Sequence, residues 1–328
     1  MQATKKTILK FQQIPTKEGV VLQESKNIKS NFDNFSDKQL FTRDFIDYYL
    51  GKQSGMIVLL PKGQRLLNAL IEILNENITR KFNFSEYSLP KMITPAICRQ
   101  AKIMGKWDDY LMSVTPYGFT KGEKKELIID PLQCTPLYAY LSNRKINSNK
   151  LPLKILDVSG PTYRNEDKST LIPLIKQMEF RRMEFIYFDK PSGVIKIREN
   201  MLTQLESVCA KLNIPFRRVI GGGCYEMTST LLQKPADNLD EMPIIDLEMK
   251  LTKPFKKRNK ELDYLEVVGA SVLKNQQTKR FNIKIANSKD QLWSGCVGIG
   301  LNRLIYVFLS NNGFNENKWP NEIKKYLK

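Results

Sequence analysis

Three residue types that together can hold a nucleotide lie close to one another near the middle of the chain. Arg164 and Glu166 are two positions apart, and Phe180 follows. At a strand end an Arg-x-Glu pair projects both side chains to one face, because strand side chains alternate. The guanidinium group can bind a phosphate, the carboxylate can accept a hydrogen bond from an exocyclic amine, and the ring can stack on a purine. An Arg-x-Glu pair by itself is more often a solvated ion pair, so ATP binding is a hypothesis at this point.

A second pattern with possible phosphate chemistry is Gly298-Ile-Gly300-Leu-Asn-Arg303. Glycines let the backbone approach a ligand closely, and the start of a helix favours an anion through its free N–H groups. Arg303 falls on the first turn of the expected helix, in reach of a terminal phosphate. Glycines before a helix more often serve close packing, so this pattern alone is a weak indication.

Hydrophobic periodicity locates the elements that must position these groups. Apolar residues at helical spacing predict helices over 63 to about 80, near 196–212, and over 300 to about 309. Extended segments are expected at 86–94, where prolines disfavour a helix, and at 185–188. Phe281, Ile283 and Ile285 alternate with polar residues, which predicts another strand. The long separations between strands favour an α+β fold with an antiparallel β-sheet flanked by helices.

Composition restricts the chemistry that the chain can perform. None of its 328 residues is histidine, which excludes histidine bases, histidine triads and histidine zinc ligands. The net charge of +18 attracts phosphate polyanions, although a general bias toward lysine accounts for it equally well. The cysteines are odd in number and scattered without a CxxC pair, which indicates reduced thiols in the cytoplasm. We expect neither a signal peptide nor a membrane span.

In their order along the chain, these segments resemble the signature motifs of class II aminoacyl-tRNA synthetases. SLPKMITPAI and the helix before it resemble motif 1, TYRNE with EFRRMEF resembles motif 2, and GCVGIGLNRL resembles motif 3, with Asn302 in place of the usual acidic residue. LQCTPLYAYL, LPLKILDVSGPTYRNE and LWSGCVGIGLNRL are similar to the atypical zinc-dependent seryl-tRNA synthetases of methanogenic archaea. The resemblance covers roughly residues 55–328. It implies a catalytic domain, which we place at 51–328, and a homodimer formed through motif 1. Residues 1–50 are polar and weakly periodic, which indicates an N-terminal extension.

The resemblance also implies two metal ions. The zinc of that family is bound by Cys, Glu and Cys, and the matching residues are Cys134, Glu184 and Cys296. Three protein ligands leave one open position, which in the family takes the amino group of the substrate. Without the resemblance, both cysteines would be interpreted as core thiols. YLEVVGASVL resembles the stretch with a glutamate that binds magnesium and ATP, which implies this role for Glu266, although Gly269 replaces a common serine.

The implied reaction is ATP-dependent activation of a small amino acid, with serine the first choice and glycine and alanine next. The carboxylate of the amino acid attacks the α-phosphorus of ATP, and pyrophosphate leaves. The resemblance assigns catalysis to Arg164 and Arg303, with Mg²⁺, through positioning and charge stabilisation. Glu166, Phe180 and Glu266 complete the implied ATP site. We expect Arg164 and Arg303 to converge on one pocket.

The acceptor of the activated amino acid is open between two possibilities. The similar segments, and the basic run from Lys253 to Lys260, favour tRNA, which we prefer. Only about 50 residues precede the core, whereas atypical seryl-tRNA synthetases carry a substantial N-terminal domain. That favours the related amino acid–carrier protein ligases, which load phosphopantetheine instead. A catalytically inactive paralogue is a third reading, which Asn302 and Gly269 favour and the intact motif arginines oppose.

Overall fold

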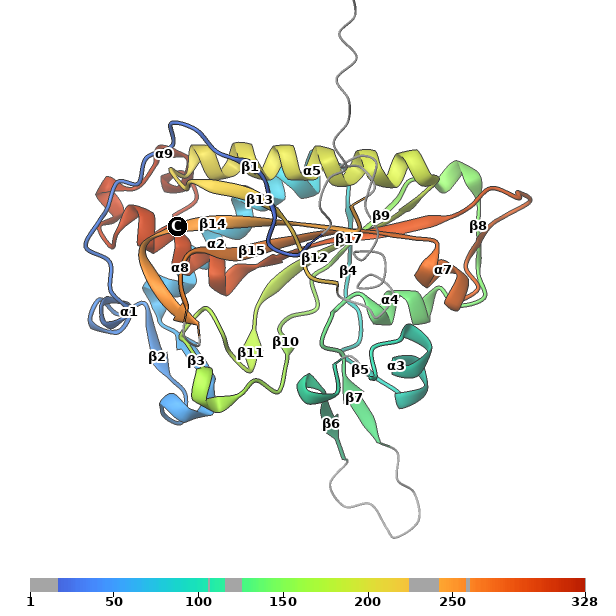
Figure 1. Cartoon of the computed structure of the whole chain (residues 1–328), viewed down its shortest axis with the longest axis horizontal. Helices are drawn as coiled ribbons and strands as arrows, with labels where there is room; N and C mark the ends of the chain where they lie inside the picture. Colours follow the sequence, from blue (N-terminus) through green and yellow to red (C-terminus); the bar gives the residue numbers. More distant parts are fainter. Residues whose placement is uncertain (1–16, 106, 116–125, 224–241, 258–259, 328) are drawn as a thin grey trace, which may run out of the picture.

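One large β-sheet organises the molecule, a computed structural model that describes residues 17–105, 107–115, 126–223, 242–257 and 260–327 (Figure 1). The order of its eight strands is β1-β13-β14-β15-β17-β12-β9-β4. Neighbouring strands are antiparallel except β4 and β9, which are parallel. The strands are β1 Val21–Glu24, β4 Ser85–Tyr87, β9 Leu153–Asp157, β12 Arg182–Asp189, β13 Phe216–Ile220, β14 Ile244–Lys257, β15 Lys260–Lys274 and β17 Trp293–Gly300. This confirms the predicted α+β fold with a mainly antiparallel sheet.

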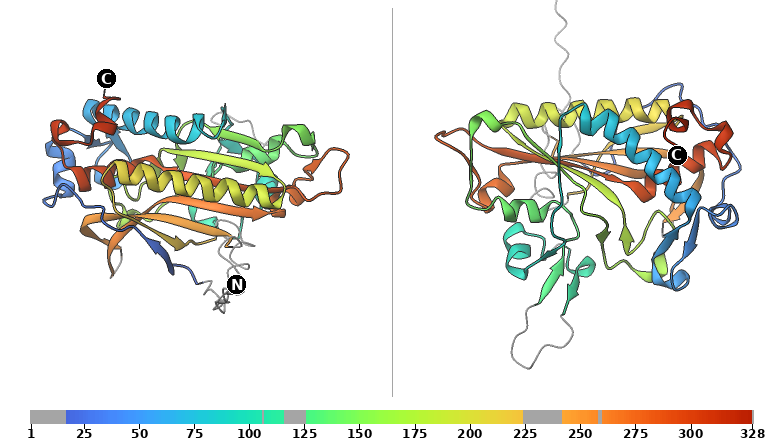
Figure 2. Two further views of the ribbon diagram at one scale, coloured as in Figure 1. Left: turned by 90° about the horizontal axis from the view of Figure 1, so that it is seen from above. Right: turned by 180° about the vertical axis from the view of Figure 1, so that it is seen from behind.

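The long helices cover one face of this sheet (Figure 2). Helices α5 and α8 pack directly on the central strands, and α2 packs against α8. The helices are α1 Asp37–Thr42, α2 Pro61–Leu74, α3 Pro95–Ala101, α4 Thr135–Tyr140, α5 Pro191–Lys211, α7 Gln276–Arg280, α8 Leu301–Asn312 and α9 Asn321–Lys324. Helix α2 continues as a π-helical segment, Asn75–Arg80. The three helices predicted from periodicity are therefore confirmed.

Short strands lie outside the large sheet and carry connecting loops. They are β2 Ile46–Tyr48 paired with β3 Ile57–Leu59, β10 Thr162–Tyr163 with β11 Glu179–Phe180, β8 Lys145–Ile146 with β16 Lys284–Ile285, and β5 Met92–Ile93, β6 Met112–Val114 and β7 Leu127–Ile129 together. In Figure 1 the β5–β7 unit and α3 lie below the sheet, opposite α5. The β10–β11 hairpin also lies below the sheet in Figure 1, beside the β2–β3 hairpin.

Two hydrophobic clusters occupy opposite faces of the sheet, and the alternation of β12 separates them. Phe185 and Tyr187 belong to the large cluster beneath the long helices, whereas Ile186 and Phe188 belong to a smaller cluster with residues of α4 and with Phe281. Because successive strand side chains point to opposite faces, Glu184 shares its face with the smaller cluster. A strand buried on both faces reads as a continuous apolar run, as FIYF in β12 does.

The prediction of a strand through Phe281, Ile283 and Ile285 is mostly wrong. Only Lys284–Ile285 is a strand, β16, whereas Phe281 follows the end of α7 and Asn282 has a positive φ of 50°. The three apolar side chains are nevertheless buried in the smaller cluster. Their alternation reflects burial of every second residue along a turn, and a short window cannot distinguish this from a strand.

Residues 17–50 are packed onto the same core as the rest of the chain. Strand β1 pairs with β13 at one edge of the large sheet. Phe35, Leu40 and Phe45 are buried within the large cluster beneath the long helices. The division after residue 50 into an extension and a catalytic domain remains a prediction. Among the residues that the structure describes, no helix is long and apolar enough to cross a membrane.

Candidate active site and metal centre

Two thiols and a carboxylate form a compact cluster on the face of the sheet that carries α4. Cys134 precedes α4, Glu184 lies on β12 and Cys296 lies on β17. Their ligand atoms all lie within 4.8 Å of one another. The residues are 2%, 1% and 9% exposed. Strand register explains part of the geometry, because Cys296 is opposite Ile186 and therefore diagonal to Glu184 on the same face.

The protonation of these groups depends on their burial and their proximity. The pKa of the Cys296 thiol is raised well above its usual value by a hydrogen bond with Cys134, by burial and by the Glu184 charge. Burial raises the pKa of Glu184, and the Arg182 charge opposes this rise. Two thiolates and a carboxylate so close together are therefore stable as anions only beside a cation. The donor set fits Zn²⁺, which prefers thiolate and carboxylate ligands and displaces their protons when it binds.

Two neighbouring residues, which sequence reasoning did not identify, orient this cluster. Arg182 lies two positions before Glu184 on the same face of β12 and forms an ion pair with its carboxylate. Ser271 Oγ lies 3.1 Å from Cys296 Sγ and accepts a hydrogen bond from the Cys296 backbone N–H. Such contacts with a metal ligand fix its orientation. Arg182 could have been found from the sequence, because it lies two positions before Glu184 on the same strand. Ser271 could not, because it becomes a neighbour of Cys296 only through the pairing of β15 with β17.

Gly298 leaves room for the Arg182–Glu184 ion pair. A Cβ atom at this position would lie 2.0 Å from Arg182 Nη2 and 2.6 Å from Glu184 Oε2. At Gly300 the nearest atom to such a Cβ would be 3.5 Å away. The first glycine of the pattern therefore serves close packing beside the metal cluster, and no phosphate is needed to explain it.

One loop connects the metal cluster with the first of the two predicted phosphate-binding arginines. The Nε atom of Arg164 donates a hydrogen bond to Pro131 O at 3.2 Å, three positions before Cys134. Gln133 has a positive φ of 71° and accepts a hydrogen bond from Thr162 Oγ1 at 3.0 Å. The loop thus holds a candidate zinc ligand and a candidate phosphate ligand in fixed relation.

Aromatic rings hold the Arg164 side chain in place. Its Cζ atom lies 5.1 Å from the centroid of Phe180 and 4.8 Å from that of Trp107. Cation–π contacts of this kind orient the planar guanidinium group. Phe180, expected to stack on a purine, therefore also contacts Arg164. Trp107 was not anticipated, because no short pattern connects it to motif 2.

Glu166 and Arg303 both have partners within the protein. Lys176 Nζ lies 3.3 Å from a carboxylate oxygen of Glu166, which is largely buried. Arg303 Nη1 lies 3.4 Å from the Glu266 carboxylate, and Arg303 Nε donates to Ile175 O at 3.0 Å. The backbone N–H of Arg164 donates a hydrogen bond to Met178 O. Met178 and Ile175 both lie in the chain between β10 and β11, so Arg164 and Arg303 contact the same hairpin. Their convergence on one pocket remains a prediction.

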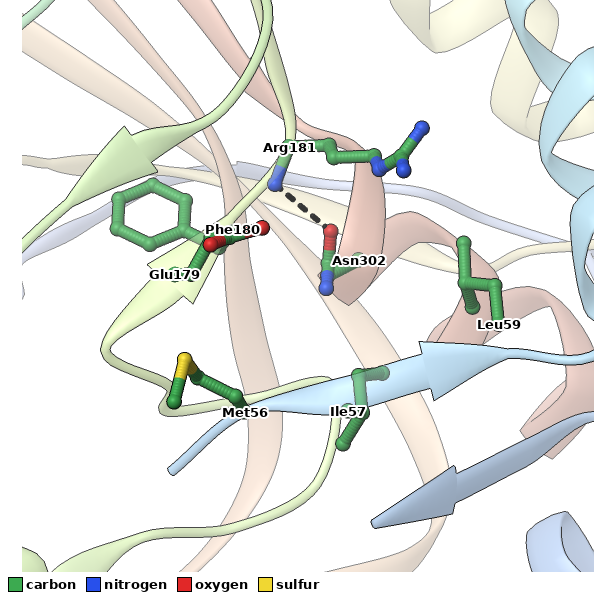
Figure 3. A pocket seen from close by; sticks show the side chains of 7 residues that line it. All are labelled: Met56, Ile57, Leu59, Glu179, Phe180, Arg181 and Asn302. Atoms are coloured by element: carbon green, nitrogen blue, oxygen red, sulfur yellow. Dashed lines mark hydrogen bonds between the residues drawn. The ribbon is translucent and has the colours of Figure 1, made fainter. Parts of the chain in front are cut away.

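A small pocket lies between the β10–β11 hairpin, β3 and the start of α8 (Figure 3). Its volume of about 40 Å³ is room for roughly three water molecules. Asn302 accepts a hydrogen bond from the Arg181 backbone N–H at 2.8 Å, drawn in Figure 3, and donates one to Gln177 Oε1 at 2.7 Å. Asn302, which replaces the acidic residue expected in motif 3, thus ties the first turn of α8 to the chain between β11 and β12.

Comparison with known proteins gives the family. A family model described as the tRNA synthetase class II core domain (G, H, P, S and T) matches residues 117–312. The chain belongs to this family. The matched range includes Cys134, Glu184, Cys296, both arginines and the central strands of the sheet.

Curated relatives of this class II core are type-2 serine–tRNA ligases. The one from Methanopyrus kandleri is 26% identical over 333 residues, which cover 93% of this chain and 62% of that protein. The one from Methanothermobacter thermautotrophicus is 27% identical over 288 residues, covering 80% and 54%. The chain thus spans little more than half of the length of these relatives.

Solved structures share the fold of this class II core. M. kandleri SerRS, in complex with A. aeolicus tRNASec, superposes with a TM-score of 0.81 at 23% identity, covering 94% of this chain and 63% of that one. The cytoplasmic serine–tRNA ligase of Naegleria fowleri, in complex with AMP, gives a TM-score of 0.73 at 16% identity, covering 96% and 65%.

The other cysteines are separate from the metal cluster. Cys98 and Cys209 are buried free thiols, and burial raises the pKa of Cys98 to about 12. Both suit the core role expected for them, and Cys224 lies outside the described residues.

The basic run from Lys253 to Lys260 is described only in part. Lys253 is exposed, and the side chains from Lys256 to Lys260 lie outside the described part of the class II core.

Proposed function

We propose that this class II core uses ATP to activate a small amino acid, serine first, as the aminoacyl-adenylate and then transfers it to tRNA. The observation that carries the proposal is the cluster of Cys134, Glu184 and Cys296, joined by one loop to Arg164. A site for an amine thus adjoins a site for a phosphate. The names of the curated relatives support serine and tRNA as substrates.

Each side chain of the site has a defined role in this reaction. Zinc held by the three ligands would supply an open position for the substrate amine. Arg182 balances the remaining negative charge and orients Glu184. Arg164, fixed between two rings, binds the α-phosphate where the carboxylate attacks, and Arg303 binds the terminal phosphates. No side-chain nucleophile is required, in agreement with a chain that lacks histidine.

Glu166, Phe180 and Glu266 complete the proposed ATP site. Glu166 accepts a hydrogen bond from the exocyclic amine of adenine, and the Phe180 ring stacks on the purine. Glu266 binds the magnesium ion of the nucleotide. Carboxylate oxygens are the ligands that Mg²⁺ prefers. Lys176 Nζ lies 3.3 Å from the Glu166 carboxylate, and this contact would open when the adenine amine binds.

ATP–pyrophosphate exchange with a panel of amino acids tests the proposal directly. We expect exchange with serine above glycine and alanine. A zinc-selective chelator added with magnesium in excess should abolish exchange while ATP binding persists, because arginines and magnesium hold the phosphates. Charging of radiolabelled serine onto total tRNA, beside a phosphopantetheinylated carrier protein, then identifies the acceptor. If radiolabel were found on the carrier protein alone, the carrier protein and not tRNA would be the acceptor. Exchange with no amino acid would refute activation and favour an inactive paralogue.

A further inference from the structure

The two-stranded ribbon of β8 and β16 carries two lysines at paired positions. Its strands are parallel and place Lys145 opposite Lys284 and Ile146 opposite Ile285. Both isoleucines are buried in the smaller cluster, and both lysines are exposed. Strand side chains alternate between two faces, so the two lysines share the outer face of the ribbon. Like charges at paired positions of neighbouring strands repel each other.

Basic residues surround this ribbon, which lies beside α7 at one end of the large sheet (Figure 1). Neither 141–156 nor 267–289, which contain β8, α7 and β16, includes an aspartate or a glutamate. The next acid along the chain, Asp290, pairs with Lys190 at 2.7 Å. The basic ribbon surface is made up of the exposed residues Arg144, Lys145, Lys150, Lys279, Lys284 and Lys289.

The charges of the basic ribbon surface are not balanced within the described chain. Lys62 shows the contrast, because this exposed lysine lies 3.4 Å from the Asp44 carboxylate. Among the residues that the structure describes, no acidic group lies within ion-pair distance of a basic residue of the ribbon surface. The repulsion between Lys145 and Lys284 is therefore uncompensated there. An anionic group of another molecule would relieve it.

The other groups of this surface favour a nucleic-acid backbone as that anion. Arg144 Cζ lies 4.3 Å from the centroid of the Tyr140 ring, which is 52% exposed. Bases stack on exposed aromatic rings, and arginine adds to such contacts. Asn282 donates a hydrogen bond to Asn143 at 2.9 Å, and both amides are exposed. Amides and lysines commonly contact phosphate and sugar. The isoleucines of the ribbon point inward, so they are not available to enter a lipid surface.

We propose that the basic ribbon surface binds the phosphate backbone of the acceptor RNA, through residues that take no part in the reaction. The inference rests on the proposed transfer to tRNA. Cys134, Cys296, Ile146 and Ile285 all belong to the smaller cluster, so one packed core supports both the metal ligands and the ribbon. RNA bound here would be held in a fixed relation to the amino-acid site.

Binding of a fluorescein-labelled serine tRNA transcript, measured by anisotropy over a range of salt concentrations, tests this assignment. Lys145→Gln with Lys284→Gln should weaken binding by about tenfold or more at about 0.1 M salt. It should also lower the slope of log K against log salt by between about one and two, because each phosphate contact contributes about 0.7–0.9. Lys196→Gln with Lys211→Gln is the matched control. It removes two charges from exposed positions of α5, on the other face of the sheet, and should bind like the wild type.

Two further measurements separate a charge contact from damage to the fold. Lys145→Arg with Lys284→Arg keeps both charges and should bind the transcript like the wild type. The glutamine variant should keep serine-dependent ATP–pyrophosphate exchange, because neither lysine belongs to the proposed reaction centre. It should melt at or above the wild-type temperature, since two repelling charges are removed.

Wild-type affinity and salt slope in the glutamine variant, or an equal loss in the α5 control, would overturn the inference. Weaker binding of a phosphopantetheinylated carrier protein or of phosphatidylglycerol vesicles, without weaker tRNA binding, would assign the surface to that partner instead. A wild type that exchanges serine but binds no RNA would overturn the inference and leave amino-acid activation intact. A wild type that binds RNA through this surface but exchanges no amino acid would refute activation and leave the surface assignment intact.

Discussion

At the scale of single residues, charge balance explains the composition of the metal cluster. Two thiolates and the Glu184 carboxylate carry three negative charges, which Zn²⁺ and the Arg182 guanidinium group would neutralise. One oxygen of Glu184 is engaged by Arg182, so the carboxylate has one oxygen left for a metal ion. Ion and arginine together thus offset the cost of burying three anions.

Zinc content tests the cluster at this scale. Purified without chelators, the wild type should hold one zinc per chain, and Cys296→Ser should lose most of it because a hydroxyl is a poor replacement for a thiolate. Cys209→Ser is the control, a buried thiol outside the cluster. Equal zinc in wild type and Cys296→Ser, or none in either, would identify Cys134 and Cys296 as ordinary core thiols.

Replacement of Arg164 tests the proposed phosphate contact. Arg164→Ala should lower serine-dependent exchange by about 10²–10³-fold, the typical cost of losing a charge-stabilising donor. Arg164→Lys should recover little, because an ammonium group cannot pack as a planar group between Trp107 and Phe180. The measurement is exchange at saturating ATP with unchanged zinc content. Wild-type exchange in Arg164→Ala would reject its catalytic role.

At the scale of elements, β12 and β17 position the site through their alternation. Glu184 and Cys296 face the smaller cluster, while Phe185 and Val297 face the long helices. A slip of one residue in their register would move every side chain to the other face. Burial on both faces therefore fixes the register and with it the distance between Glu184 and Cys296, two of the candidate metal ligands.

Paired glycine variants in β17 test the packing at this element. Gly298→Ala should weaken zinc binding and cost about 1–3 kcal/mol of folding stability, because its Cβ collides with the Arg182–Glu184 pair. Gly300→Ala meets no atom closer than 3.5 Å and should retain zinc content and melting temperature. Zinc analysis and thermal unfolding of both variants provide the comparison. Identical behaviour of the two would mean that Gly298 is not required for the ion pair.

At the scale of the whole molecule, the edge of the large sheet is the candidate dimer surface. Strand β4 is the last strand at that edge, and all three of its residues are exposed. Tyr87 on β4 and Met92 on β5, at 36% and 52% exposure, are exposed apolar side chains of the motif 1 segment. An exposed strand edge with apolar side chains favours pairing with another chain. We therefore retain the homodimer through motif 1 as a proposal.

Sedimentation at increasing concentration tests this surface. The wild type should sediment as a dimer, and Tyr87→Lys with Met92→Lys should shift it to a monomer without a change in melting of the core. Val58→Lys is the control, an exposed apolar residue at 42% on the separate β2–β3 hairpin. A monomeric wild type at every concentration would exclude the homodimer, and dimers in both variants would place the interface elsewhere.

The sequence by itself determined the local elements and the family. Helices α2, α5 and α8 follow from apolar spacing because a helix face is defined within a few turns of chain. The ordered motifs were sufficient for the class II core, which the family match confirmed. The strand predicted from the alternation of apolar and polar residues at Phe281 was wrong, because residues buried in a turn can show the same short alternation.

Only the tertiary structure decided which residues surround the candidate site. Arg182 pairs with Glu184, a candidate metal ligand, and Trp107 contacts Arg164, the proposed phosphate ligand; no motif describes either contact. Ser271 lies beside Cys296 because β15 pairs with β17. Strand register is a long-range property, set by burial on both faces of a sheet whose neighbouring strands come from distant parts of the chain. For that reason the resemblance could propose Cys134, Glu184 and Cys296 as metal ligands, whereas the groups that orient and balance them were found only in the fold.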